Sequence, residues 1–280
     1  MKRIINTLFK KISPLLILVI FLFSSCQKEL DKSPLDKFDQ STFWTNQTNL
    51  MLAVTGLYAG NIVFNKPDYN SSDWWSYSGL LNMEFSTDNA YDRRGENSPY
   101  QKLTNGTLTS TNAVPGYYWK NSYSRIADCN YFLENVDKAA VSDSVKSRFK
   151  AEARFLRACQ YFYLSQFFGS VPLEAKTLSK EEANTVTKSS KDDVEKFVET
   201  ELIAASQSLP RYGEMPASEF GRASKQAALA FLGRLYLAEE RWKDAADTYK
   251  QIIDYGDNII DPDYSGLFDG SNENSKEIIF

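Results

Sequence analysis

The sequence predicts a mainly α-helical protein built from antiparallel helical hairpins, with one long loop region rich in aromatic residues. Apolar side chains recur at spacings of three and four in two short runs, 229–236 and 242–252, which a polar break separates. The small residues Gly233 and Ala245 lie where the backbones of two such helices would approach closely. Further amphipathic stretches upstream end at glycine or proline, as helices commonly do. These observations together favour an all-α fold class.

The pair of helices between Gly221 and Gly256 is typical of a repeat unit. One predicted face carries Leu229, Leu232, Gly233 and Tyr236, and the other carries Trp242, Ala245, Tyr249 and Ile252. This spacing resembles the tetratricopeptide pattern, whose period is about 34 residues. A single hairpin cannot bury its own apolar face, so we expect further hairpins stacked against it.

Residues 1–25 are interpreted as a targeting segment rather than as part of the fold. Basic residues at positions 2, 3, 10 and 11 precede an apolar run over 15–23, which is too short to span a bilayer. Ser24 and Ser25 then precede Cys26, an arrangement that resembles a bacterial lipoprotein signal with Cys26 as the lipidated first residue of the mature chain. An ordinary signal peptide with an incidental cysteine is the alternative. The polar, charged residues 26–42 are interpreted as a tether leaving the membrane.

The composition excludes several classes of function. The chain of 280 residues contains no histidine, which rules out an imidazole base or a histidine metal ligand. It has 32 basic and 36 acidic residues, and four of the basic ones lie in the targeting segment. A mature chain this acidic is a poor nucleic-acid binder, and acyl chains rather than the protein surface would hold it to a membrane. No cofactor and no metal site are predicted.

Two cysteines remain after the targeting segment, Cys129 and Cys159. Both lie on the apolar stripes of predicted helices, so we expect free buried thiols. A disulfide is the alternative in an exported protein, although two cysteines without a framework spacing argue little for it.

Four more helices are predicted upstream of the first hairpin. They cover residues 47–59, from Tyr118 to near Ala140, from 142–143 to Gly169, and from a capping box at 190–193 to Pro210. Thr45 or Asn46 would cap the first, whose inward residues are Leu50, Ala53, Leu57 and Tyr58. Trp119 and Trp242 lie on hairpin stripes and are expected in the core. Glu152, Arg154 and Arg157 stand at helical spacing, which favours surface or inter-hairpin ion pairs over a charged site.

Residues 61–115 differ from the helical segments because they are rich in Pro, Gly, Ser, Thr and Asn, with a helical signal only over 75–85. A stretch this long inside a globular chain usually forms functional loops or loosely paired strands. Its scattered aromatic residues are Tyr69, Trp74, Trp75, Tyr77, Tyr91 and Tyr100. Flat rings beside short polar groups suit carbohydrate, because a sugar offers an apolar face for stacking and hydroxyls that need directional partners.

The candidate ligand-binding residues in this region are Trp74, Trp75 and Tyr91. Adjacent tryptophans point in different directions, so one of the pair could belong to the core instead. Asp88 and Asn89 could bind a hydroxyl or a cation, or could tie the loop to the helical scaffold.

Beyond Gly256 the sequence indicates short, irregular elements. Residues 259–260 are interpreted as a short strand, and Tyr264, Leu267 and Phe268 as an aromatic-capped turn. Residues 275–280 are interpreted as the start of another strand, and natural domains rarely stop on such a segment. We therefore interpret residues 43–280 as the N-terminal region of a longer protein.

Several stretches together resemble the SusD/RagB family of outer-membrane nutrient-uptake lipoproteins. They are Phe43-Trp44 with Ala53, Gly56 and Tyr58; residues 86–90; Trp119, Tyr123, Ile126, Asn130 and Leu133; residues 151–158 with Tyr161-Phe162 and 168–173; Gly221-Arg222-Ala223 through Tyr236; Trp242 to Tyr249; and residues 274–280. Their order along the chain after Cys26 makes the resemblance specific to this family. Together the stretches cover nearly all of the mature chain.

The resemblance implies an α-helical protein on tetratricopeptide-like hairpins, anchored by lipid at the surface of the outer membrane. It implies that the protein covers a TonB-dependent, SusC-like transporter as a lid. It also implies that the protein itself binds oligosaccharide or another nutrient, through aromatic residues on long loops. It implies neither an enzyme nor a cofactor. Members of the family are generally much longer, which agrees with an incomplete C-terminus.

Two other classes of function stay open. A tetratricopeptide scaffold that binds only protein fits the hairpins but leaves the aromatic loop region unexplained. A glycoside hydrolase needs two carboxylates held roughly 5–10 Å apart across a sugar, and no motif selects such a pair among the acidic residues.

Overall fold

The computed structural model describes residues 43–59, 74–98 and 100–280, so the predicted targeting segment, Cys26 and the tether lie outside the described residues. The helices are α3 (Gln47–Ala59), α4 (Tyr77–Glu84), α5 (Gln101–Thr104), α6 (Ala113–Asn135), α7 (Asp143–Phe168), α8 (Lys180–Ala183), α9 (Lys191–Ser208), α10 (Lys225–Ala238) and α11 (Trp242–Tyr255). Within these ranges we find no β-strand, only an isolated bridge between Pro172 and Lys188. None of the described helices combines the length and the apolar character needed to cross a bilayer.

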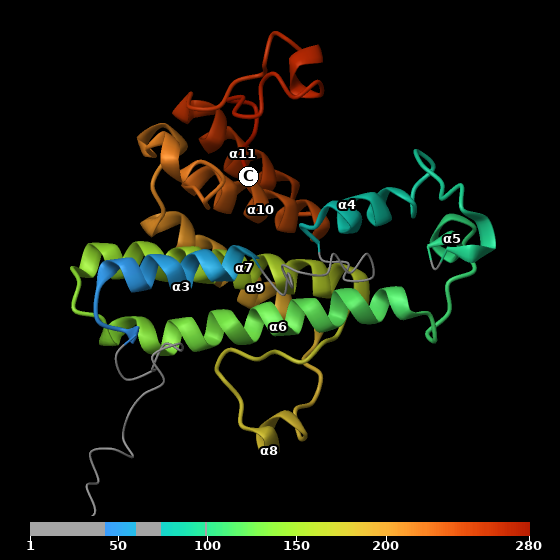
Figure 1. Cartoon of the computed structure of the whole chain (residues 1–280), viewed down its shortest axis with the longest axis horizontal. Coiled ribbons are helices and arrows are strands. Elements are labelled where there is room, and N and C mark those ends of the chain that lie inside the picture. The colour runs from blue at the N-terminus through green and yellow to red at the C-terminus, as the bar shows by residue number, and fades with distance from the viewer. Residues whose placement is uncertain (1–42, 60–73, 99) are drawn as a thin grey trace, which may run out of the picture. The chain divides into compact units, whose positions relative to one another are not determined.

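The longer helices pack against one another within the unit Trp44–Phe280 (Figure 1). Helices α6 and α7 lie side by side, and α3 packs against both. Helix α9 packs against α7, α10 against α9, and α11 against α10. The largest fully buried side chains include Phe132, Phe149, Phe155 and Tyr161, which come from α6 and α7. The predicted all-α fold class is confirmed, with α6 and α7 as its central pair.

The hairpin of α10 and α11 forms as its sequence predicts. Leu229, Leu232 and Tyr236 are buried on α10, and Gly233 lies under the ring of Tyr249 from α11. A β-carbon placed on Gly233 would stand 2.6 Å from two atoms of that ring, closer than packed atoms approach. The missing side chain therefore lets the two helices meet.

Two tryptophans expected in the core differ in their surroundings. Trp119 is half-buried, with its ring 5.0 Å from that of Tyr123 and 5.2 Å from that of Phe168. Trp242 is 62% exposed, so its core assignment is wrong. It is the first residue of α11, whose packing on α10 instead uses Ala245 and Ile252 further along.

Helix α6 begins earlier than its sequence suggests. Asn112 accepts a hydrogen bond from the backbone N–H of Val114 and caps the helix, which starts at Ala113 rather than Tyr118. Pro115 lies in the first turn, where backbone N–H groups have no partner within the helix, so proline costs no hydrogen bond there. Pro115 suggests a helix break when the sequence alone is considered, but a proline in the first turn is compatible with the start of a helix.

The predicted ends of α7 and α9 are close to those observed. Ser142 and Ser190 cap the two helices through their hydroxyl oxygens. The Ser190 hydroxyl also donates to the Asp193 carboxylate at 2.6 Å, so this is a cap with a side-chain contact and not the reciprocal capping box expected. Gly169 ends α7 with a φ of 70°, a conformation that favours glycine.

The strands expected after Gly256 do not form in the described chain. A single backbone hydrogen bond, from Ile259 N to Lys276 O at 3.3 Å, links the two segments, whereas a strand pair needs a repeating ladder. Ile259 and Ile260 are 54% and 87% exposed and have no core to face. The predicted turn is present as a 3₁₀ turn over Ser265–Leu267.

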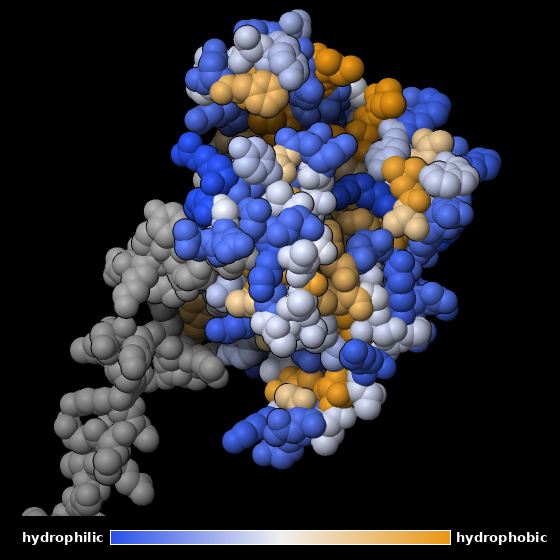
Figure 2. Space-filling model, turned by 90° about the vertical axis from the view of Figure 1, so that its right-hand side faces the viewer, coloured by the Kyte–Doolittle hydropathy of each residue, from blue (hydrophilic) through white to orange (hydrophobic). Residues whose placement is uncertain are grey.

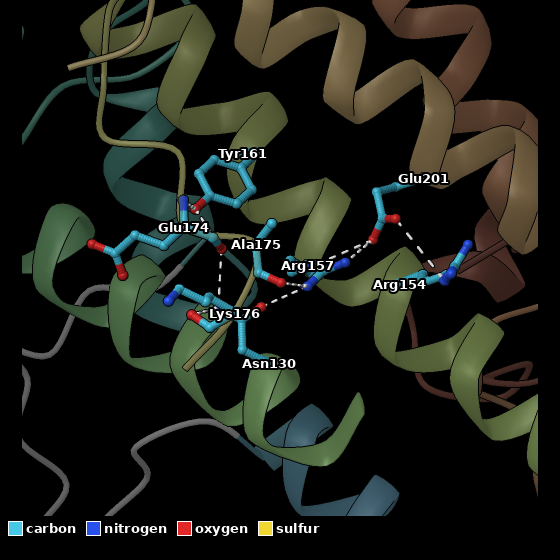
Figure 3. A network of polar contacts seen from close by, with 8 residues as sticks. All are labelled: Asn130, Arg154, Arg157, Tyr161, Glu174, Ala175, Lys176 and Glu201. Atoms are coloured by element: carbon cyan, nitrogen blue, oxygen red, sulfur yellow. Dashed lines mark hydrogen bonds and ion pairs between the residues drawn. The ribbon is translucent and has the colours of Figure 1, made fainter. Parts of the chain in front are cut away.

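The buried guanidinium of Arg157 on α7 joins three helices and one loop (Figure 3). Its Nε donates to Glu201 of α9 at 3.1 Å, and its Nη1 donates to Asn130 Oδ1 of α6 at 2.6 Å and to Ala175 O at 3.1 Å. The Asn130 amide in turn donates to the carbonyls of Glu174 and Lys176. The expectation that Arg157 forms a structural pair between helices is confirmed.

A second buried group, Glu152, joins α7 to α3 and to the segment before α10. Tyr58 of α3 donates to Glu152 Oε2 at 2.8 Å, and Arg222 lies at 2.8 Å from the same oxygen. The Tyr58 hydroxyl also accepts the backbone N–H of Ala223. Burial raises the pKa of the Glu152 carboxyl, and the charge of Arg222 opposes that shift.

Cys129 and Cys159 are free and completely buried. Burial raises the pKa of the Cys129 thiol to about 12, so it is protonated and inert at neutral pH. The expectation of free buried thiols is confirmed.

We predict that Gly233→Leu lowers the free energy of unfolding by roughly 1–3 kcal/mol, because the new side chain must displace Tyr249. Thermal and denaturant unfolding of the parent and variant measure the change.

The matched control is Gly56→Leu in α3, where a β-carbon meets no atom within 4 Å. It should be neutral or stabilise by up to about 1 kcal/mol, because leucine is the better helix former. In a Tyr249→Ala background the cost of Gly233→Leu should shrink. An equal effect at both glycines would contradict a close approach at Gly233.

Candidate functional site

The five candidate ligand residues lie in very different surroundings. Trp74 is 3% exposed, Trp75 is half-buried, and Asp88, Asn89 and Tyr91 are exposed. Single exposed hydrophobic residues are normal on a protein surface, and the face in Figure 2 is mostly hydrophilic with hydrophobic residues in separate patches. Exposure alone therefore does not mark a site, and the contacts of each residue decide its role.

Trp74 is part of an aromatic cluster. Its ring lies 4.3 Å from Tyr118 of α6, and it stacks on Tyr163 and Phe167 of α7 at 4.7 and 5.1 Å. Its indole N–H donates to Ser122 Oγ at 2.7 Å. Because protein atoms leave only 3% of Trp74 exposed and occupy its N–H, this residue holds the chain onto α6 and α7 and offers almost no surface for a sugar to stack on. Of the tryptophan pair, it is the core member.

Trp75 faces different groups from its neighbour. Its ring lies 5.6 Å from that of Phe280 in an edge-to-face arrangement, and the Arg125 guanidinium stands 5.1 Å from its centre. Arg125 also donates to the carbonyls of Leu57 and Tyr58 at the end of α3. Trp75 thus sits beside a cation that is held by the scaffold, with part of its surface open to solvent.

The residues before Asp88 attach the loop to the end of α4. Ser86 Oγ donates to Met83 O at 2.6 Å, and Thr87 Oγ1 donates to Glu84 O at 2.8 Å. The backbone N–H of Asn89 donates to Thr87 Oγ1. Ser86 and Thr87 therefore attach the loop to the helical scaffold, which is one of the two roles that the sequence allows for Asp88 and Asn89. The side chains of Asp88 and Asn89 are exposed.

Asp92 is a residue whose importance the sequence did not reveal. It is buried beside the exposed Tyr91 and accepts two hydrogen bonds from the Arg94 guanidinium, at 2.9 and 2.8 Å. These bonds hold the pKa of Asp92 at about 2, below its usual 3.8. The Arg94 guanidinium also lies 5.6 Å from the ring centre of Tyr100, which is buried. This pair fixes the turn that carries Tyr91, and its only sequence signal is an Asp two residues before an Arg.

Metal chemistry finds no support in the described part of the chain, where no group of three or more Cys, Asp or Glu side chains could hold an ion. The exposed loop offers instead one flat ring, one carboxylate and one amide, from Tyr91, Asp88 and Asn89. Such groups can stack on an apolar face and exchange hydrogen bonds with hydroxyls.

We predict that acid weakens the fold through Asp92. Its folded pKa lies below the unfolded value, so its contribution is complete above about pH 4 and is lost as the pH falls towards 2. Because Arg94 is more than half exposed, the contribution is roughly 1 kcal/mol. Asp92→Asn should lower Tm at pH 7, and the two Tm values should converge near pH 2.

The control for this series is Asp88→Asn, which removes an exposed carboxylate from the same loop. Its Tm at pH 7 should stay close to that of the parent. A gap between parent and Asp92→Asn that is constant from pH 7 to pH 2 would contradict the role of the ion pair.

Comparison with known proteins shows one consistent group. Residues 30–237 match the model of a SusD-like family described as "Starch-binding associating with outer membrane". SusD-like protein P25 of Formosa agariphila is 26% identical over 96% of this chain and 51% of its own length. The starch-binding protein SusD of Bacteroides thetaiotaomicron is 28% identical over 90% of this chain and 46% of its own.

Solved structures give the same picture. A SusD-like carbohydrate-binding protein from Bacteroides fragilis superposes with a TM-score of 0.80 and 48% identity, over 85% of this chain and 46% of the other. A laminarin-binding SusD-like protein superposes with a TM-score of 0.74 at 24% identity, which shows the shared fold. The chain spans about half the length of the relatives that it matches.

Proposed function

Because residues 30–237 match its model, the chain belongs to the SusD-like family, and from this membership we propose that it captures glycan at the cell surface for a TonB-dependent transporter. The relatives are named as binding proteins for starch, laminarin or carbohydrate, which supports glycan as the ligand class. The names describe binding proteins and not enzymes, which supports a role without catalysis. A SusC-like transporter as partner follows from the family resemblance.

The observation that carries the proposal is the exposed ring of Tyr91, which directly precedes a turn held by the Asp92–Arg94 ion pair. The ring is 70% exposed, and Asp92 directly after it is held by Arg94. Because the backbone next to Tyr91 is held and a tyrosine side chain has only two torsion angles, little freedom is lost when a sugar stacks on the ring. The exposed Asp88 and Asn89 precede it by two and three residues and can accept or donate hydrogen bonds to sugar hydroxyls.

Trp75 is a second proposed contact, through the part of its ring that is open. Trp74 takes a supporting role in this proposal, because its ring is covered on α6 and α7. The proposed contacts are thus Tyr91, Asp88 and Asn89 on the loop, and Trp75 as a separate one beside Arg125 and Phe280.

We predict that Tyr91→Ala weakens glycan binding several-fold and leaves Tm unchanged, because an aromatic stack contributes about 1 kcal/mol and the ring touches little of the core. Trp74→Ala should instead lower the free energy of unfolding by roughly 3–5 kcal/mol. Calorimetry against a panel of oligosaccharides measures the binding, and thermal unfolding measures the stability.

The matched control is Tyr264→Ala, which removes a ring that is 75% exposed on a different loop. It should bind glycan like the parent. Equal binding by the parent and Tyr91→Ala would place the site elsewhere. No binding of any glycan would favour the protein-binding scaffold, and cleaved products after incubation would favour a hydrolase.

The proposed membrane anchor is the lipidated Cys26, which follows the signal of residues 1–25 and begins the tether 26–42. We predict that Cys26→Ala moves the protein from the membrane fraction to the soluble fraction, because the acyl chains provide the attachment. Cell fractionation with detergent partition measures the change, and intact mass measures the lipid. A variant that partitions into detergent with the mass of the parent would contradict lipidation at this residue.

A further inference from the structure

An apolar pocket lies between α4, the loop after α5, the start of α6 and the end of α7. It has a volume of about 240 Å³, and its lining includes Trp74, Met83, Leu103, Val114, Tyr118 and Phe168. Phe167 and Leu108, which also line it, are 53% and 39% exposed, so the pocket reaches the surface. It is a cavity with an open mouth and not a closed void.

The polar atoms of the aromatic lining are already used by the protein. The indole N–H of Trp74 donates to Ser122 at 2.7 Å, and the hydroxyl of Tyr118 donates to Gly79 O at 2.9 Å. Two polar side chains, Asn82 and Ser86, also line the pocket, and the other walls are the carbon surfaces of rings and aliphatic side chains. Neither water nor a bare sugar fits such walls well, because most of its hydrogen bonds would be lost without replacement.

The size of the pocket limits what it can hold. An apolar cavity of about 150 Å³ can enclose benzene, whereas whole drug-sized ligands need roughly 300 Å³ or more. A volume of about 240 Å³ therefore suits a single ring with a short attachment. Aromatic walls favour an aromatic guest, because paired rings gain more than their buried area alone.

The pocket is also close in sequence to the proposed sugar contacts. Ser86 lines it and is exposed, and it precedes Asp88 by two residues. Its hydroxyl donates to Met83 O, which leaves the oxygen of Ser86 able to accept a hydrogen bond at this side of the pocket. A ring in the pocket and a sugar on the loop can therefore belong to one molecule.

We propose that this pocket binds an aryl group carried by the glycan, so that the protein prefers aryl-substituted carbohydrate over the bare sugar chain. The inference rests on the proposed function, because it assigns the aryl group to a glycan held at Asp88, Asn89 and Tyr91. The pocket supplies apolar contact, and the loop supplies hydrogen bonds and one stacking ring.

The first experiment titrates 4-fluorophenol into the full chain and follows its ¹⁹F NMR signal. The parent should bind the probe in a saturable manner. Leu103→Trp and Val114→Phe fill the pocket and should each weaken binding by at least about tenfold. Leu237→Trp makes the same change as the first variant at a residue 42% exposed on α10, and should bind like the parent. Thermal unfolding identifies any variant that fails to fold. If one of the two filling variants is unfolded, probe binding by the other one tests the proposal.

The second experiment compares a glycan from the binding panel with its phenyl glycoside by calorimetry. The parent should bind the phenyl glycoside about tenfold more tightly, and Leu103→Trp should remove that preference while still binding the bare glycan. Equal affinity of the parent for both, or probe binding unaffected by both filling variants, would overturn the inference. If neither glycan form binds, the proposed function fails, whereas binding of both with equal affinity leaves that function standing and removes only the aryl preference.

Discussion

The buried guanidinium of Arg157 is the group on which the arrangement of the central helices depends. A charge inside a protein is tolerated only where partners surround it, and Arg157 has Glu201, Asn130 and the carbonyl of Ala175. Such a pair is weak evidence of net stability, because removing two charges from water costs about as much as their attraction returns. A placement of α6, α7 and α9 that separated Arg157 from these partners would leave a buried charge unpaired. We therefore infer that the pair favours one arrangement of the three helices more than it adds to their stability.

The same scaffold determines where the candidate site can lie. Trp74 is fixed by its hydrogen bond to Ser122 on α6 and by stacking on Tyr163 of α7, so the chain entering α4 is attached to the central helices. The end of α4 then holds the loop through the hydroxyls of Ser86 and Thr87. A sequence of short contacts thus leads from the core to the exposed residues that follow. The loop is long in sequence, but its described part is anchored at several points.

The sequence predicts well those features that local periodicity and caps control. The bounds of α3, the hairpin of α10 and α11, and the small residue Gly233 at its contact all follow from helical spacing. It predicts poorly where the deciding contact is distant. Nothing local distinguishes the covered Trp74 from its half-open neighbour, because the rings that cover it come from α6 and α7. The partner of Asp92 is only two residues away, but the burial of Asp92 depends on the rest of the fold. The predictions of a buried Trp242 and of a strand at 259–260 are wrong for the same reason. Both assume packing partners for apolar side chains, and the fold does not provide those partners.

The energetics of the proposed site argue for several weak contacts and not for one deep pocket. A single stacked ring contributes about 1 kcal/mol beyond its buried area, whereas micromolar affinity corresponds to about 8 kcal/mol. Tyr91 alone therefore accounts for a small part of such binding, and hydrogen bonds from groups such as Asp88 and Asn89 must add to it. Hydrogen bonds to fixed polar groups depend on the orientation of each hydroxyl, while stacking tolerates many sugars. In a site of this kind the ring would supply adhesion to sugars in general, and the polar side chains beside it would supply the discrimination among them.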